Sequence, residues 1–208
     1  INDKYEDFDL DKIDIESLPE LEKFMLSKIY FLNNKFENYF KKYDFHNLYK
    51  ELLNFCTVDL SAFYFDIRKD TLYCDPINSE KRKSCVTILN VLLKSLLRWF
   101  APILSFTTEE IHQLISKNTK SIHLEKFLTF PDKFKNEQLT ERWSQLIKIR
   151  DVCNISIEEK RASKEIGSSL EADLNIQLNE KYKEIVGDMD LSELCIVSKT
   201  VVNFDNQS

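Results

Sequence analysis

Cationic side chains occur in two clusters that could bind phosphate groups. One cluster is Lys81, Arg82 and Lys83, and the other is Arg150, Lys160, Arg161 and Lys164. Lys and Arg neutralise phosphates and release condensed counterions, so binding of this kind weakens as the salt concentration rises. Arg161 and Lys164 lie three residues apart, and Lys160 and Lys164 lie four apart, so we expect these side chains to share one helix face. A solvated helix face without a ligand is the alternative for each of them.

Aromatic side chains are the second feature with binding potential, because a flat ring can stack on an unpaired base. The candidates are Tyr39, Tyr43, Tyr64 and Trp143. Packing in a core is the more usual role of such residues. Asp59 and Arg98 also stand out within apolar stretches, and we interpret them as an internal ion pair that orients helices.

The sequence excludes several kinds of catalytic site. Its two glycines, Gly167 and Gly187, lie too far apart for a dinucleotide fingerprint or a P-loop. The three histidines, His46, His112 and His123, form no HxxxH metal pair, and no GxSxG elbow occurs. We therefore predict no catalytic residue, no metal site and no cofactor, while a triad built from residues distant in the sequence stays open.

The cysteines and the start of the chain bear on where the protein works. The five cysteines contain no CxxC pair, so free thiols in a reducing cytosol are expected and a cytoplasmic protein is predicted. The chain begins at Ile1 without an initiator Met, which we interpret as a mature product or an excised fragment. No signal peptide is evident, and the apolar residues 91–104 are too few and too interrupted to span a membrane.

The formal charge of the whole chain is −6, which at first argues against binding of nucleic acid. Residues 1–22 hold nine acidic and two basic side chains, a net charge of −7. The remaining residues hold 26 acidic and 27 basic side chains, a net charge of +1. The acidity therefore belongs to the first segment, and the rest of the chain can present a basic face.

Residues 1–16 are interpreted as an extended, solvated segment, after which apolar residues recur at helical spacing. A capping box at Ser17 and Glu20 predicts the start of a helix that continues to Phe40. Asp44 is the expected cap of the next helix. The later predicted helices cover residues 45–67, 82–100, 107–117 and 139–157.

Two of these helices have distinct end signals. The third is expected to end at Ala101, because the residue before a proline avoids helical geometry. The fourth is expected to start at a Thr107 cap, with Glu110 reaching back to it and Phe106 packing onto Ile111.

The spacing of apolar residues changes after Gly167. Residues 170–178 alternate between apolar and polar side chains, which predicts a half-buried strand. Residues 180–186 suit a short helix, and residues 194–204 suit a second strand. The predicted fold is therefore mainly α, with a helical bundle over residues 1–136 and a small α+β appendage over residues 137–208.

Three stretches of the sequence form a set with a specific order and spacing. They are residues 54–75, residues 97–111, and residues 150–164 with a continuation over 166–172. The run Asp59-Leu-Ser-Ala-Phe-Tyr64 in the first stretch, and the runs Ala-Pro-Ile-Leu and Thr-Glu-Glu-Ile in the second, are the most distinctive. Together they resemble the bacterial-type isoleucyl-tRNA synthetases, which are class I aminoacyl-tRNA synthetases. The Ala-Pro-Ile-Leu and Thr-Glu-Glu-Ile runs are shared with the valyl, leucyl and methionyl relatives of these enzymes.

The resemblance implies the helical anticodon-binding domain and the start of the C-terminal junction of such an enzyme. In that family, an arginine-containing helix precedes the position that matches Ile1, and a zinc module follows the position that matches Ser208. The HIGH and KMSKS signatures of the catalytic domain and the editing domain are absent from the sequence. The expected role is therefore to bind the anticodon stem and loop of tRNA without catalysis.

The resemblance also implies the chemistry and partners of the parent enzyme. It would ligate isoleucine to tRNA with ATP and magnesium, and a need for zinc is left open. The expected partners are isoleucine-specific tRNA and the rest of the synthetase chain, in a monomer without membrane contact. Two alternatives stay open: a helical protein-interaction domain that docks through its acidic first segment, and a stand-alone enzyme with scattered catalytic residues.

Overall fold

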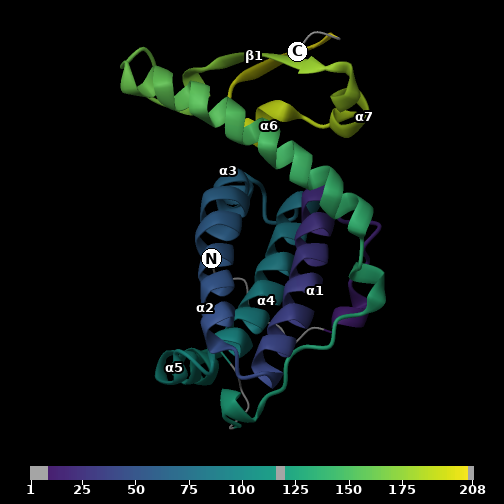
Figure 1. Ribbon diagram of the computed structural model, residues 1–208, viewed down its shortest axis with the longest axis vertical. Helices are drawn as coiled ribbons and strands as arrows, with labels where there is room; N and C mark the ends of the chain where they lie inside the picture. The colour runs from purple at the N-terminus through teal and green to yellow at the C-terminus, as the bar shows by residue number, and fades with distance from the viewer. Residues whose placement is uncertain (1–8, 116–119, 206–208) are drawn as a thin grey trace. The chain divides into compact units, whose positions relative to one another are not determined.

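The computed structural model describes residues 9–115 and 120–205, and the chain divides into two compact units after Glu137. In its described residues, most helices of the first unit run alongside one another, and the helix at residues 105–115 lies across them (Figure 1). The second unit combines a long helix with short helices and a two-stranded sheet. The predicted fold class, mainly α with a small α+β part, is confirmed. Within the described ranges, none of the helices has the length and apolar character needed to cross a membrane.

Helix α1 (Glu20–Lys41) is amphipathic, and its apolar side chains at helical spacing are buried in the first unit. The predicted capping box is wrong, because Pro19 precedes the helix and no side chain caps it. Proline fits this position because the first turn leaves its backbone N–H groups unpaired. Ser17 instead donates a hydrogen bond to the carbonyl of Asp14 at 2.9 Å. Before this helix, Leu10–Lys12 form a short 3₁₀ turn where an extended segment was predicted.

A continuous helical run follows α1 and changes its pitch in the middle. It consists of α2 (Phe45–Asn54), a π-helical segment (Phe55–Phe65) and α3 (Asp66–Cys74). Asp44 caps α2 as predicted, because its side chain accepts a hydrogen bond from the backbone N–H of Asn47 at 3.3 Å. The predicted single helix therefore exists but is longer, and the wider π turns were not foreseen.

Helix α4 (Glu80–Phe100) crosses the middle of the first unit, and its Trp99 is fully buried. The indole N–H of Trp99 donates to Asn33 Oδ1 at 3.0 Å, and its ring packs edge-on against Phe36 at 5.0 Å and Phe55 at 6.0 Å. These contacts join α4 to α1 and to the π-helical segment. The predicted end of this helix before Pro102 is confirmed, but the predicted reason is wrong, because Ala101 keeps helical backbone angles (φ −49°, ψ −43°).

Helix α5 (Ser105–Ile115) starts two residues before the predicted Thr107 cap. A tight turn carries the chain from α4 directly into α5, with Leu104 N–H donating to the Phe100 carbonyl at 2.7 Å. Thr107 is therefore already inside the helix, and Phe106 is 93% exposed and cannot pack onto Ile111 as predicted. The predicted continuation to residue 117 lies partly outside the described residues.

The segment between α5 and the second unit packs along α1 and contains two short 3₁₀ turns, Ile122–Leu124 and Asp132–Phe134. Asn33 donates to the Leu128 carbonyl at 2.9 Å, and the Tyr30 hydroxyl donates to Asp132 Oδ1 at 2.9 Å. These side chains hold an otherwise irregular stretch against the bundle.

The second unit contains most of α6 (Glu137–Ala162), the strands β1 (Asp173–Asn179) and β2 (Lys199–Asp205), and the short helices α7 (Lys183–Val186) and α8 (Leu191–Cys195). The two strands are parallel, and their register runs from Asp173 opposite Lys199 to Asn179 opposite Asp205. Parallel strands need a crossover connection, which α7 and α8 provide. The strands and the short helix were predicted, but residues 170 and 171 belong to a 3₁₀ turn rather than to the first strand, and residues 194 and 195 belong to α8 rather than to the second strand.

Candidate nucleic-acid interface

The first predicted phosphate-binding cluster lies on the first turn of α4. Lys81 and Arg82 are half-buried and Lys83 is exposed. Lys83 forms an ion pair with Glu80 at 2.8 Å, and Arg82 donates to the carbonyl of Asp75 at 3.4 Å. The N-terminal end of a helix carries partial positive charge, which adds to these three cations. This arrangement can attract a phosphate group, although Glu80 neutralises part of the charge.

The second predicted cluster lies at the C-terminal end of α6, and one part of the prediction is wrong. Helix α6 ends at Ala162, and Lys164 has a left-handed backbone with a φ of 61°, so Lys164 does not share a helix face with Lys160 or Arg161. A hydrogen bond from Glu165 N–H to the Lys160 carbonyl at 3.0 Å closes this turn. The turn nevertheless brings Arg161 and Lys164 together, because both line one open cavity of about 490 Å³.

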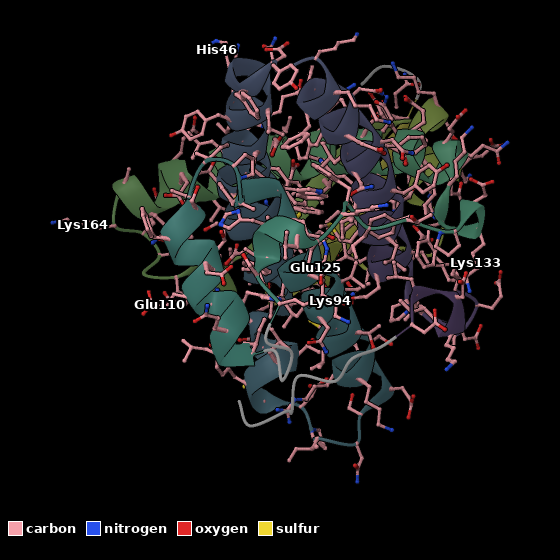
Figure 2. The ribbon with its side chains drawn as sticks, turned by 90° about the horizontal axis from the view of Figure 1, so that it is seen from below. His46, Lys94, Glu110, Glu125, Lys133 and Lys164 are labelled. Carbon is pink, nitrogen blue, oxygen red and sulfur yellow. The ribbon has the colours of Figure 1, made fainter. Side chains whose placement is uncertain are left out.

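The charges of the second cluster are partly paired. Lys160 pairs with Glu165 and Arg161 pairs with Glu158, each at 2.6 Å. The hydrogen bond from Lys160 holds the pKa of the Glu165 carboxyl below its usual value. Lys164 forms no ion pair with any residue that the structure describes, and Figure 2 shows its side chain extending away from the ribbon. Exposed ion pairs contribute at most about 1 kcal/mol, so a phosphate can replace either carboxylate at little cost.

Arg150 differs from the other predicted members of the second cluster. It is 6% exposed, and its Nε donates to the carbonyl of Leu194 in α8 at 2.9 Å. Arg142, nearer the start of α6, makes similar hydrogen bonds and donates to the carbonyls of Ile185 and Val186 at 2.8 and 3.1 Å. Both arginines therefore tie α6 to the short helices of the second unit, and the burial of Arg150 favours a structural role.

The four aromatic candidates occupy different environments. Tyr64 and Trp143 are buried, as their residue types favour. Tyr39 is half-buried, and its hydroxyl donates to Glu51 at 2.7 Å. Tyr43 alone among the four is strongly exposed, at 81%. It is therefore the one of these rings with a face available for stacking.

The predicted pair between Asp59 and Arg98 is wrong. Asp59 forms its ion pair with Lys28, and Arg98 pairs with Glu125 at 2.9 Å. A buried ion pair is instead formed by two other side chains of the first unit, Glu22 and Arg68.

The burial of Glu22 was not predicted, because this residue belongs to an acidic segment of the sequence. Its spacing from the apolar residues that follow it is the sequence signal that indicates burial. Met25, Leu26 and Ile29 follow it at three, four and seven residues, and all three are buried. A residue with that spacing lies on the buried face of a helix.

Two of the three histidines lie beside backbone carbonyl groups. The Nε2 atom of His112 lies 3.1 Å from the Lys120 carbonyl oxygen, and that of His123 lies 3.3 Å from the Ser105 carbonyl oxygen. His46 is exposed on α2, where Figure 2 shows it at the outer edge of the ribbon. Across residues 9–115 and 120–205, no group of three or more His, Cys, Asp and Glu side chains is arranged to hold a metal ion.

Comparisons with known proteins agree with the resemblance drawn from the sequence. A family model described as the anticodon-binding domain of tRNA ligase matches residues 22–178. The isoleucine–tRNA ligase of Pelagibacter ubique is 63% identical over 206 residues, which are 99% of this chain. Those of Bartonella quintana and Zymomonas mobilis are 38% and 36% identical over 94% and 91% of this chain. The chain spans only 23%, 20% and 21% of the length of these three relatives.

Proposed function

The chain belongs to the family of anticodon-binding domains of tRNA ligases, and we propose that it binds the anticodon stem and loop of a tRNA. The family match over residues 22–178 is the observation that carries this proposal. The chemistry of the ligase reaction takes place on other parts of the parent protein. Half-buried and exposed Lys and Arg side chains on the first turn of α4, and exposed ones at the end of α6, support the proposal, because they can neutralise the phosphates of a folded RNA.

The names of the relatives support a proposal for the amino acid and the tRNA. The three relatives above are named isoleucine–tRNA ligases, and one is identical to this chain at 63% of the aligned positions. The parent enzyme would therefore join isoleucine to its tRNA with ATP and magnesium, as a cytoplasmic monomer. The tRNA and the rest of the synthetase chain would be the partners of the part described above.

Two surfaces would contact tRNA phosphates. The first comprises Lys81, Arg82 and Lys83, and the second comprises Lys160, Arg161 and Lys164. Arg150 would support the second surface from within, because its bond to Leu194 fixes α6 against α8. Each surface would contribute to affinity and to its salt dependence, and base recognition requires additional contacts.

Binding of the 208-residue chain to isoleucine tRNA and to a non-cognate tRNA, each at two salt concentrations, tests this proposal. We expect tighter binding of isoleucine tRNA, a steep loss of affinity at the higher salt concentration, and no isoleucine-dependent exchange of pyrophosphate into ATP. Equal affinity for the two tRNAs would contradict the assignment to isoleucine. Failure to bind any RNA at low salt would contradict the function itself and would favour the helical protein-interaction domain.

A further inference from the structure

Four aromatic rings form a row on the surface of the first unit, where α1 turns into α2. The ring centroids of Tyr43 and Phe45 lie 6.3 Å apart, those of Phe45 and Phe40 lie 5.8 Å apart, and those of Phe40 and Phe127 lie 5.6 Å apart. Tyr43, Phe40 and Phe45 are 81%, 40% and 38% exposed. Tyr49, one helical turn after Phe45, is 48% exposed. An exposed aromatic group of this extent is unusual for a surface without a partner.

The backbone of the turn explains why Tyr43 points away from the core. Tyr43 follows the last residues of α1 with a φ of 56°, the left-handed conformation in which helices commonly end. The N–H of Asp44 then donates to the Tyr39 carbonyl at 2.9 Å, which fixes the turn. Glycine is the residue that usually takes such a position, so a large aromatic ring here is held outward in a strained conformation.

Three lysines are sequence neighbours of these rings: Lys42, Lys50 and Lys126 lie next to Tyr43, Tyr49 and Phe127. The three lysines form no ion pair with another residue in the described part of the chain. The one carboxylate within the turn, that of Asp44, accepts hydrogen bonds from the backbone and the side chain of Asn47 at 3.3 and 2.7 Å. Cations therefore exceed unengaged carboxylates beside the exposed rings.

A cavity of about 670 Å³ adjoins the row and shares Phe40 and Phe127 with it. The lining combines the basic side chains of Lys41, Arg98 and Lys126 with three carboxylates. Glu37 pairs with Lys41, Glu125 pairs with Arg98, and Asp132 accepts a hydrogen bond from Tyr30, so Lys126 is the lining cation without an ion pair in the described residues. Its volume is within the range of pockets that hold ligands of the size of a nucleotide. The rings, the cations and the cavity are thus continuous parts of one surface.

We propose that this surface, made of the aromatic row with Tyr49, the three lysines and the adjoining cavity, binds an unpaired segment of the tRNA. Bases stack on Tyr43 and Tyr49, phosphates lie near Lys42 and Lys50, and one base enters the cavity beside Phe127. Stacking on exposed rings tolerates any base, and Lys side chains follow the phosphate backbone. The proposal rests on the tRNA-binding function proposed above and adds a contact site to it.

An unpaired RNA segment fits this surface better than a protein partner does. Protein interfaces are depleted in Lys, because a lysine without a partner carboxylate is costly to remove from water. An apolar protein segment that covered the rings would remove three such lysines from water without a partner carboxylate, namely Lys42, Lys50 and Lys126. An RNA strand satisfies the rings and the cations together, since it presents both bases and phosphates.

The test compares Tyr43→Asn with Tyr43→Phe in the 208-residue chain. Asn removes the ring and still tolerates the left-handed conformation, whereas Phe keeps the ring and serves as the matched control. Because loss of one stacked base typically costs about 1–3 kcal/mol, we expect Tyr43→Asn to bind tRNA about 5- to 150-fold more weakly, with Tyr43→Phe close to the wild type. Nucleotides of the tRNA that the wild type protects from a base-modifying reagent should become reactive in the Tyr43→Asn complex.

Equal affinity and equal nucleotide protection for the two variants would overturn this inference alone, provided that the wild type binds tRNA. Absence of tRNA binding by the wild type would instead overturn the proposed function. A second variant, Lys42→Glu with Lys50→Glu, alters only exposed side chains and guards against misfolding of the Tyr43 variant. It should weaken tRNA binding and reduce its dependence on salt, and unchanged binding would count against the site.

Discussion

Arg68 forms two parallel hydrogen bonds with Glu22 in the interior of the first unit. Arg68 Nε donates to Glu22 Oε1 at 2.7 Å, and Arg68 Nη2 donates to Glu22 Oε2 at 2.8 Å. The two side chains are 4% and 0% exposed. The hydroxyl of Tyr64 lies 3.3 Å from Glu22 Oε1 and 3.5 Å from Cys85 Sγ. This polar group therefore connects α1, the π-helical segment, α3 and α4.

Breaking the Glu22–Arg68 pair should destabilise the first unit strongly. Arg68→Met leaves a buried carboxylate without its cation, and Glu22→Gln leaves a buried guanidinium without its anion. Loss of one partner of a buried ion pair typically costs about 3–5 kcal/mol, whereas replacing both by apolar residues costs much less. Urea denaturation of the two single variants and of Glu22→Leu with Arg68→Met measures these costs. Single variants within about 1 kcal/mol of the wild type would show that the pair is not important for stability, because surface pairs have effects of that size.

The thiol of Cys85 should make stability fall at alkaline pH. Burial, the largest cause, raises the pKa of Cys85 from 9.0 to about 11 in the folded chain. The Cys85 thiol therefore holds its proton more tightly in the folded state than in the unfolded state. Its contribution to the free energy of unfolding is full below pH 9 and is lost as pH rises toward 11. Burial also raises the pKa of Tyr64, which adds to the same trend at higher pH.

The thiol of Cys85 should lower the free energy of unfolding by about 2–3 kcal/mol between pH 9 and pH 11, because each unit of pKa difference corresponds to about 1.4 kcal/mol. The free energy of unfolding, measured in urea at several pH values between 8 and 11, should decline less steeply for Cys85→Ala than for the wild type. Cys74→Ala, at an exposed position, is the control and should keep the wild-type slope. The slopes rather than the absolute values are compared, because the alanine also leaves a small cavity.

The helices of the first unit could be predicted because their burial follows the helical period. Leu21, Met25 and Ile29 recur every four residues and are all buried. The start of α5 could not be predicted from a cap signal alone, because it depends on the turn that Leu104 makes with Phe100. Tertiary context of this kind overrides a local sequence signal.

The candidate site could be predicted in part, because charge clusters are visible in a sequence and exposure is not. Arg150 and Lys160 have the same kind of charge, yet one is buried against α8 and the other is exposed. Phe127 is distant from Phe40 in the sequence, so their contact at 5.6 Å requires the folded connection between α5 and α6. Alternating aromatic and cationic residues between Phe40 and Lys50 were the sequence signal for that surface.

Charge reversal at the end of α6 should weaken tRNA binding and lower its dependence on salt. Arg161→Glu with Lys164→Glu removes two cations that line one cavity. If both contact phosphates, the slope of log affinity against log salt should decrease by about 1.5–2. Lys148→Glu, an exposed change elsewhere on α6, makes half of this change in net charge and shows how far net charge alone affects binding. Undiminished tRNA binding by the double variant would argue against this surface.

Arg150→Met separates a structural role of Arg150 from a role in phosphate binding. Methionine keeps much of the apolar stem but cannot donate to the Leu194 carbonyl, which Arg150 Nε reaches at 2.9 Å. Hydrogen bonds from charged groups contribute about 1.5–3 kcal/mol, so the free energy of unfolding should fall by about that amount. Because the side chain is buried, the salt dependence of tRNA binding at a temperature where the variant is folded should equal that of the wild type. A variant with unchanged stability and a smaller salt slope would instead place Arg150 among the residues that contact phosphate, and would require its side chain to leave α8 when tRNA binds.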